Sequence, residues 1–153
     1  EVRILLHHCS KIEPPMLDYR PTPKQRSTIE LLKYLTVMGP ALVTAAKQGF
    51  DPAAWGEADK VAQARNFEQT MTALAAQADT YAALLGDYTD ADFREEIDMF
   101  GRKTTRGNFL VNSVLSGCAA YRTQLFLYLK ACGRDELNTM NLWAGIDAPM
   151  AAV

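Results

Sequence analysis

The sequence predicts an all-α protein, a four-helix bundle with a short irregular C-terminal tail. Three observations support this prediction: four stretches repeat apolar residues with the period of a helix, short connectors separate them, and too few strand-like runs occur to make a sheet. The 153 residues, 48% of them hydrophobic, fit one domain spanning 1–153. A chain of this length removes roughly two-thirds of its unfolded surface from water, so it needs no disulfide or metal to hold it together.

The first predicted helix spans residues 1–12 and ends before Pro14-Pro15, because proline cannot continue a helix. The second begins at Ser27, which forms with Glu30 the capping-box pattern that satisfies free backbone amides at a helix start. It runs to about residue 48. Gly39-Pro40 inside it predicts a kink, since Pro40 removes one backbone hydrogen bond.

The third predicted helix starts at a second capping-box-like pattern, Asn66 to Gln69, after a turn-rich stretch at 49–56 and a polar connector. It runs to Leu85, where Gly86 ends it. The charged segment that follows predicts a short helix at 90–95 and an extended stretch at 96–100.

The fourth predicted helix begins near residues 105–108 and ends at Gly133. At about 100° per residue, one face carries small and polar side chains where a packing helix would carry large aliphatic ones. That stripe contains Leu110, Val114, Gly117, Tyr121, Leu125 and Tyr128, with Ser113, Ala120 and Gln124 along its edge. The pattern indicates a pocket or the close approach of another helix.

Charge and composition argue against two classes of partner. The net charge of −2 and the pI near 5.7, with lysines and arginines spread along the chain, do not fit a nucleic-acid-binding surface. The longest charge-free runs, 34–46 and 107–121, are shorter than the ~20 apolar residues that a membrane span requires. We therefore expect no nucleic-acid partner and no membrane partner.

Three cysteines without a framework spacing indicate free thiols in a reducing compartment, so we expect a cytoplasmic protein. Because the first residue is Glu1 rather than methionine, a removed signal sequence stays an alternative.

Three segments carry a resemblance to a known family. They are Leu17-Asp18-Tyr19-Arg20-Pro21, Glu30-Leu31-Leu32-Lys33-Tyr34-Leu35, and Tyr121-Arg122-Thr123-Gln124-Leu125 with Tyr128-Leu129 and Gly133. Over about residues 17–133 the chain resembles the DinB-like family, four-helix-bundle proteins that include metal-dependent thiol S-transferases and the mycothiol-dependent maleylpyruvate isomerase. The resemblance implies the same bundle fold here.

The family binds its metal through a histidine on the second helix and two histidines one helical turn apart on the last. The matching positions in this chain are Tyr34, Gly117 and Tyr121. Glycine offers no side chain, and a neutral tyrosine with a pKa near 10 is a poor ligand for zinc or nickel. These positions predict that the chain binds no metal and uses no cofactor.

Five residues on the inward faces form the predicted ligand-binding site: Tyr34, Ser113, Gly117, Tyr121 and Gln124. In one interpretation two phenols, a hydroxyl and an amide bind a small polar molecule. In the other, the two tyrosine rings fill the volume left by the metal and hydrogen-bond each other or a buried water.

The remaining polar candidates have structural interpretations. His7 and His8 diverge by about 100° on a helix and cannot readily share a metal; we expect half-buried or terminal side chains, with a His7–Cys9–Cys118 cluster as the alternative. Cys118 has no basic neighbour that would lower its pKa, so we expect it to be a small packing residue. We expect Arg122 to form an ion pair with an acidic residue on a neighbouring element. The alternative is a solvated arginine on the surface.

A second stripe on the last helix is largely apolar, so we expect another element or another subunit to cover it. It consists of Leu115, Ala119, Arg122 and Phe126. Dimerisation is common in the family, so the resemblance favours a homodimer. Residues 141–145 predict a tail docked on the bundle.

Two hypotheses of function follow. The first is a metal-free bundle that binds a small molecule or self-associates. The second is a thiol-dependent S-transferase or isomerase with a relocated metal or none. No nucleophile has an evident base and no glycine-rich phosphate loop occurs, so the sequence assigns no catalytic residue.

Overall fold

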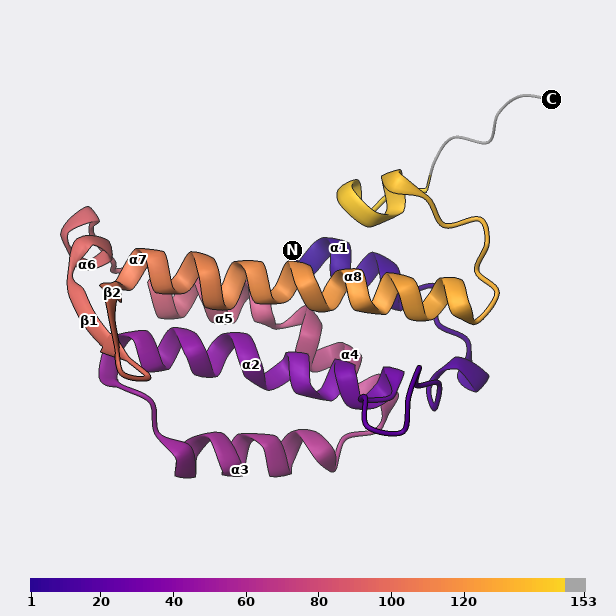
Figure 1. Ribbon diagram of the computed structural model, residues 1–153, viewed down its shortest axis with the longest axis horizontal. Helices are drawn as coiled ribbons and strands as arrows, with labels where there is room; N and C mark the ends of the chain where they lie inside the picture. Colours follow the sequence, from indigo (N-terminus) through magenta and orange to yellow (C-terminus); the bar gives the residue numbers. More distant parts are fainter. Residues whose placement is uncertain (148–153) are drawn as a thin grey trace.

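A computed structural model describes residues 1–147, which are mostly helical (Figure 1). The all-α class is confirmed, with the addition of one two-stranded sheet. Helix α2 contacts α3, α4, α5 and α8, so it is the central element of the molecule. In Figure 1, α7 and α8 form one long line beside α2, α3 lies on the opposite side of α2, and α5 lies behind α7 and α8.

The first two helices agree with their sequence signals. Helix α1 spans Val2–Cys9, and a 3₁₀ turn, η1, follows at Pro14–Met16. Helix α2 spans Thr28–Gln48; the Ser27 hydroxyl accepts from the Glu30 amide, and the Glu30 carboxylate accepts from the Ser27 amide at 2.8 Å. The helix continues through Pro40 to its end at Gly49, which has a φ of 90°.

One helix occupies the segment that the sequence assigned to a connector. Helix α3 spans Pro52–Gln63, and the Asp51 carboxylate caps it by accepting from the amides of Ala53 and Ala54. It carries the standard start signals, an acidic cap and a proline in the first turn. The prediction failed because α3 fully buries only Ala62 and so lacks an apolar stripe.

The predicted third helix is two helices. Asn66 caps α4, Phe67–Ala75, as expected. The helix is interrupted at Ala76, however, and a second helix, α5, follows at Gln77–Leu85. At the break, the buried Gln77 amide donates a 2.7 Å hydrogen bond to the Leu35 carbonyl of α2. Gly86 follows α5 with a φ of −65°, so the left-handed C-terminal turn expected there is not formed.

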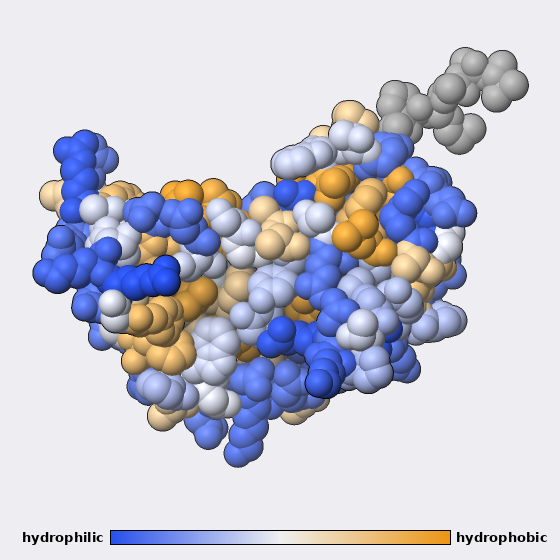
Figure 2. Space-filling model, viewed as in Figure 1, coloured by the Kyte–Doolittle hydropathy of each residue, from blue (hydrophilic) through white to orange (hydrophobic). Residues whose placement is uncertain are grey.

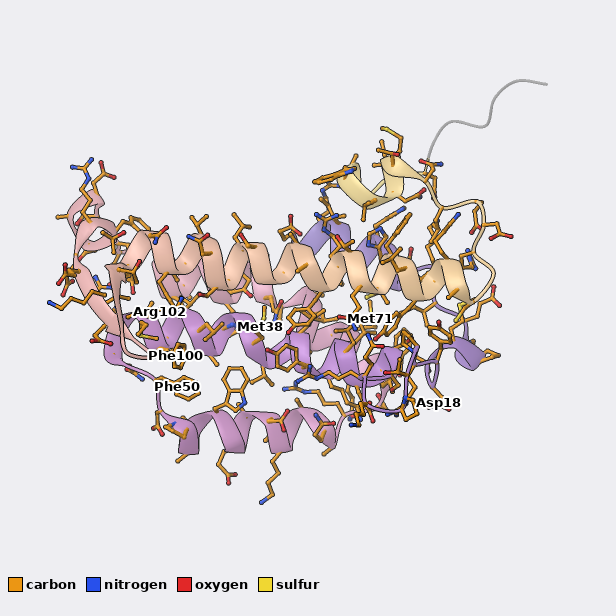
Figure 3. All side chains as sticks on the ribbon, viewed as in Figure 1. Asp18, Met38, Phe50, Met71, Phe100 and Arg102 are labelled. Atoms are coloured by element: carbon orange, nitrogen blue, oxygen red, sulfur yellow. The ribbon has the colours of Figure 1, made fainter. Side chains whose placement is uncertain are left out.

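A short hairpin closes one end of the molecule. After α6, Asp90–Arg94, strand β1, Glu96–Met99, pairs antiparallel with β2, Arg102–Thr105. Phe100 and Gly101 join them with φ values of 56° and 76°, as a type I′ turn requires. The sequence predicted the first strand only, because Phe-Gly is a weaker turn signal than Asn-Gly. Phe100 and Phe50 face one another, with ring centroids 5.2 Å apart, so the hairpin tip rests on the loop after α2 (Figure 3).

The last long helix is not uniform. It begins as α7, Arg106–Phe109, continues as a π-helical segment, η2, Leu110–Leu115, and becomes α8, Ser116–Ala131. The sequence predicted a single α-helix, since the 3.6-residue period does not reveal a change of winding. The end is as expected, because Gly133 has a φ of 94°.

The C-terminal segment docks on helices α1 and α8, as predicted. A second π-helical segment, η3, Met140–Ala144, contacts α1 and α8, and the Arg3 guanidinium donates to the Ala144 carbonyl at 2.8 Å. Trp143 on η3 is largely exposed.

Within residues 1–147, one helix is long and apolar enough, by length and composition, to cross a membrane. It is α2, half of whose apolar stretch is buried inside the protein. A helix at the centre of a core passes the same test.

Candidate ligand-binding sites

Two of the five predicted site residues, Tyr34 and Tyr121, lie against each other. The Tyr34 ring on α2 and the Tyr121 ring on α8 have centroids 5.2 Å apart and meet edge to face. Burial raises the pKa of Tyr34 to about 12, and the neighbouring Tyr121 hydroxyl contributes to that rise. The Tyr34 phenol is therefore neutral at pH 7.

The other three predicted site residues have separate surroundings. At Gly117 a Cβ atom would lie 3.3 Å from the Met38 sulfur, so this glycine permits a close approach of α2 and α8. The Gln124 amide donates to the Tyr128 hydroxyl, which in turn donates to the Arg26 carbonyl at 3.0 Å. Ser113 is half-buried on η2.

Two residues that the sequence did not assign complete the surroundings of Tyr34. The Arg26 guanidinium carbon lies 3.9 Å from the centroid of the Tyr34 ring, and the Trp55 ring of α3 lies 6.2 Å away. Trp55 was missed because α3 itself was missed. Arg26 comes directly before the Ser27 cap, a position from which a side chain can reach back over the first turns of α2.

A cavity of about 560 Å³ lies elsewhere, between α2, α5 and the η2–α8 helix. Its lining is apolar apart from Glu1, the Tyr81 hydroxyl and the Cys118 thiol. The residues are Glu1, Val2, Val43, Tyr81, Leu85, Phe93, Gly107, Leu110, Val111, Val114, Leu115 and Cys118. None of the five predicted site residues lines it. From the stripe on the last helix only Leu110 and Val114 are in its wall, and neither is one of the small or polar positions that led us to expect a pocket.

Tyr81 crosses the interior beside this cavity. Its hydroxyl lies against Gly39 of α2, where any Cβ atom would overlap it, and near Cys118 of α8. The hydroxyl is buried and has no hydrogen-bond partner within residues 1–147. Burial raises the pKa of Tyr81, and Cys118 adds to the rise. Gly39 thus admits the end of a tyrosine from α5, a role that the Gly39-Pro40 pattern alone did not reveal.

The cysteines are free thiols. Burial raises the pKa of Cys118 above its ordinary value, and it raises the pKa of Cys9 to about 12. Both thiols are therefore protonated at neutral pH and are poor nucleophiles. The His7–Cys9–Cys118 alternative is not supported, since residues 1–147 contain no group of three or more histidine, cysteine or acidic residues placed to hold a metal ion.

The two histidines differ in surroundings. His7 is half-buried, as expected, and lies 3.1 Å from the Asn141 amide. The prediction was wrong for His8, which is fully buried against the Phe126 ring and has no partner for either ring nitrogen within residues 1–147. Burial lowers the pKa of His8 to about 4.

Arg122 forms the predicted ion pair, and the solvated alternative is wrong. Its side chain is 4% exposed and donates to Glu1 at 2.8 Å and to the Leu142 carbonyl. Arg122 and Phe126 therefore face α1 and the C-terminal segment, which cover this part of the second stripe. Leu115 stays more than half exposed at the other end of the stripe.

Comparison with protein-family models finds no match to this chain, and comparison with curated proteins finds none.

Proposed function

We propose that this protein is a metal-free helical bundle that binds an apolar small molecule in the cavity between α2, α5 and η2–α8. The cavity carries the proposal: its volume of about 560 Å³ lies within the 300–1,000 Å³ typical of ligand pockets, and its walls are largely apolar. Empty apolar space of this size costs stability through lost contacts, and a ligand that fills it restores them.

The wall chemistry favours a neutral ligand. A charged group placed among Val43, Leu110 and Val114 would lose its hydration without gaining a partner. The one charged residue in the wall, Glu1, already pairs with Arg122. The protonated thiol of Cys118 supports binding rather than the alternative of thiol-dependent transfer or isomerisation.

We further propose that the fold is a four-helix bundle of DinB-like type. Its four members would be α1, α2, the α4–α5 pair and the α7–α8 line, with α3 as an added outer helix. Support comes from the direct contacts of α2 with α4, α5 and α8, and of α1 with α4 and α8. The meeting of Tyr34 and Tyr121 is also what their alignment with the family's metal ligands would require.

The binding proposal is tested with N-phenyl-1-naphthylamine, a neutral fluorescent probe of apolar sites. We expect the probe to raise the melting temperature and to fluoresce when bound. Val114→Phe, which fills part of the cavity, should weaken binding at least about tenfold, the loss expected from displacing ligand contacts worth about 1.4 kcal/mol. Leu127→Phe, at an exposed position of α8, is the matched control. Equal binding by both variants, or no binding by the wild type, would contradict the proposal.

We also propose a cytoplasmic homodimer. The free thiols fit a reducing compartment. Val111 and Leu115 are more than half exposed at the cavity rim and offer an apolar contact for a second copy. Leu115→Glu should then yield monomers in sedimentation experiments, whereas a wild-type monomer at micromolar concentration would refute the dimer. Phe126 lies on the same stripe but packs on His8, so a substitution there would disturb the interior as well.

A further inference from the structure

The C-terminal segment, residues 138–147, is held to α1 and α8 largely by polar contacts (Figure 1). The Arg3 guanidinium donates to the Ala144 carbonyl at 2.8 Å, and the Lys11 ammonium donates to the Asp147 carboxylate at 2.8 Å. Three of the four large apolar side chains in the segment are exposed, namely Met140, Trp143 and Ile146. The segment therefore gains little from the hydrophobic effect when it docks.

The segment lies over a histidine that has no hydrogen-bond partner. His8 on α1 is completely buried, with its ring 5.7 Å from the Phe126 ring of α8 and next to the main chain of Asn141 in η3. Neither ring nitrogen has a partner among residues 1–147. A buried polar group without a partner costs stability, and a buried charge without one costs far more. Docking of the segment therefore requires a neutral His8.

The surroundings of His8 oppose a proton on its ring. Burial has the largest effect on its pKa, which is lowered to about 4, and His7 and Arg122 lower it further. Glu1 acts in the opposite direction, but it already pairs with Arg122 at 2.8 Å. Helix α4 also packs on α1, and its one charged residue, Glu68, is exposed. The other charged groups on α1 and in the segment are Arg3, Lys11 and Asp147.

Detachment of the segment opens the His8 ring to water on the side of η3, and a hydrated histidine has a pKa of 6.5. Because the undocked state binds the proton more tightly, a falling pH shifts the equilibrium toward that state. The contribution of His8 to docking is therefore complete above pH 6.5 and is lost progressively down to about pH 4. Between pH 7 and pH 5 the ratio of docked to undocked protein should fall about 20-fold.

We propose that the C-terminal segment is a cover released by acid: protonation of His8 detaches residues 138–147 from α1 and α8 while the helices stay folded. The observation that carries the proposal is the buried imidazole, without a partner, at the place where α1, α8 and η3 meet. The proposal does not depend on whether the apolar cavity binds a ligand, because His8 does not line that cavity.

NMR spectra of the full chain between pH 7 and pH 4.5 test the proposal, with the amides of residues 140–146 and the Trp143 indole as reporters. We expect these resonances to move to the positions of a disordered peptide as the pH falls, while the amides of α2 and the Trp55 indole keep their positions. A wild-type segment that stays docked at pH 4.5 would overturn the proposal, as would one that detaches only when α2 unfolds.

Two variants at His8 and its neighbour assign the transition to one group. His8→Leu cannot take up the proton, so its segment should stay docked at pH 4.5. His7→Gln is the matched control, because it removes the other imidazole but keeps an acceptor for the Asn141 amide, which lies 3.1 Å from His7. The control should retain the transition. The same transition in His8→Leu would overturn the proposal.

A third variant imitates the undocked state at neutral pH. A Cβ atom at Gly145 would lie 2.9 Å from the Cα atom of Ile4 on α1, so Gly145→Val should hold the segment away from the helix. The pKa of His8, followed through its ring C–H resonances, should then rise toward 6.5. A pKa of His8 that is unchanged in the undocked variant would show that the segment does not control the proton.

Discussion

The two hydrophobic clusters of this protein are built differently. One cluster joins α1, α2, α4 and α8, and its leucines, among them Leu31, Leu74 and Leu125, are completely buried. The other lies near the hairpin, around Val43, Phe109 and Val114, and it borders the large cavity. Apolar surface also shows on the outside near the hairpin, where Figure 2 has an orange patch beside its left end.

The difference has a physical origin in side-chain size and helix winding. In the closed cluster, leucines from facing helices fill the interior. In the open cluster, Tyr81 crosses to Gly39, and η2 replaces regular α-helix in the cavity wall. The comparison teaches that one half of the protein is closely packed, while the other half leaves open the cavity in which we propose that a ligand binds.

The largest expected effect tests this division directly. Leu125→Ala in the closed cluster should lower the free energy of unfolding by about 2–5 kcal/mol, because it leaves a cavity in packed surroundings. Val114→Ala beside the open cavity should cost about 1–2 kcal/mol, near the transfer value of the methyl groups removed. Denaturant unfolding measures both. Equal losses would show that the two clusters are packed alike.

The second effect is the pH dependence of stability that arises from His8, which is buried against Phe126 in the closed cluster. His8 has a pKa of about 4 in the folded protein, against 6.5 when unfolded, so the unfolded chain binds the proton more readily. Stability attributable to His8 is therefore full above pH 6.5 and falls as the pH decreases, by about 2 kcal/mol between pH 7 and pH 5. His8→Leu should flatten this part of the stability–pH curve. An unchanged curve in that variant would mean that another group is responsible.

A third, smaller effect concerns the contact between α2 and α5. Gly39→Ala forces the Tyr81 ring toward the cavity and should cost about 1–2 kcal/mol, as overpacking does. It should also weaken binding of the apolar probe. Gly56→Ala on α3 is the control: nothing lies within 4 Å of its added methyl, so it should stabilise the helix by up to about 1 kcal/mol. Thermal unfolding distinguishes the two variants. Equal changes in their melting temperatures would show that the contact between Gly39 and Tyr81 does not require a glycine.

The smallest effect compares two phenols. Tyr81→Phe removes a buried hydroxyl whose polar neighbour is the Cys118 thiol, a weak hydrogen-bond partner, so stability should stay constant or rise by up to about 1 kcal/mol. Tyr121→Phe removes a hydroxyl that lies against Tyr34 and should cost up to about 1 kcal/mol. A clear loss for Tyr81→Phe would show that its hydroxyl does have a partner.

Local signals predicted the parts of this fold that depend on neighbouring residues. Ser27, Asn66 and Gly133 mark helix ends in the sequence, and the structure has those ends. The break at Ala76, by contrast, coincides with a hydrogen bond from Gln77 to an α2 carbonyl 42 residues earlier in the chain. The approach of Tyr34 and Tyr121 followed from the resemblance, whereas the cavity depends on Tyr81, whose partner Gly39 is visible only in three dimensions.

The π-helical segment at Leu110–Leu115 has a consequence for how this protein can change over time. Each π turn holds about one residue more than an α turn, so the segment behaves as a single-residue insertion absorbed within a continuous helix. Deleting one residue there would return the helix to regular winding, while α7 and α8 keep their orientation relative to each other. The side chains that the π-helical segment contributes to the cavity wall could thus change in one genetic step, while the closed cluster and the helix end at Gly133 stay in register.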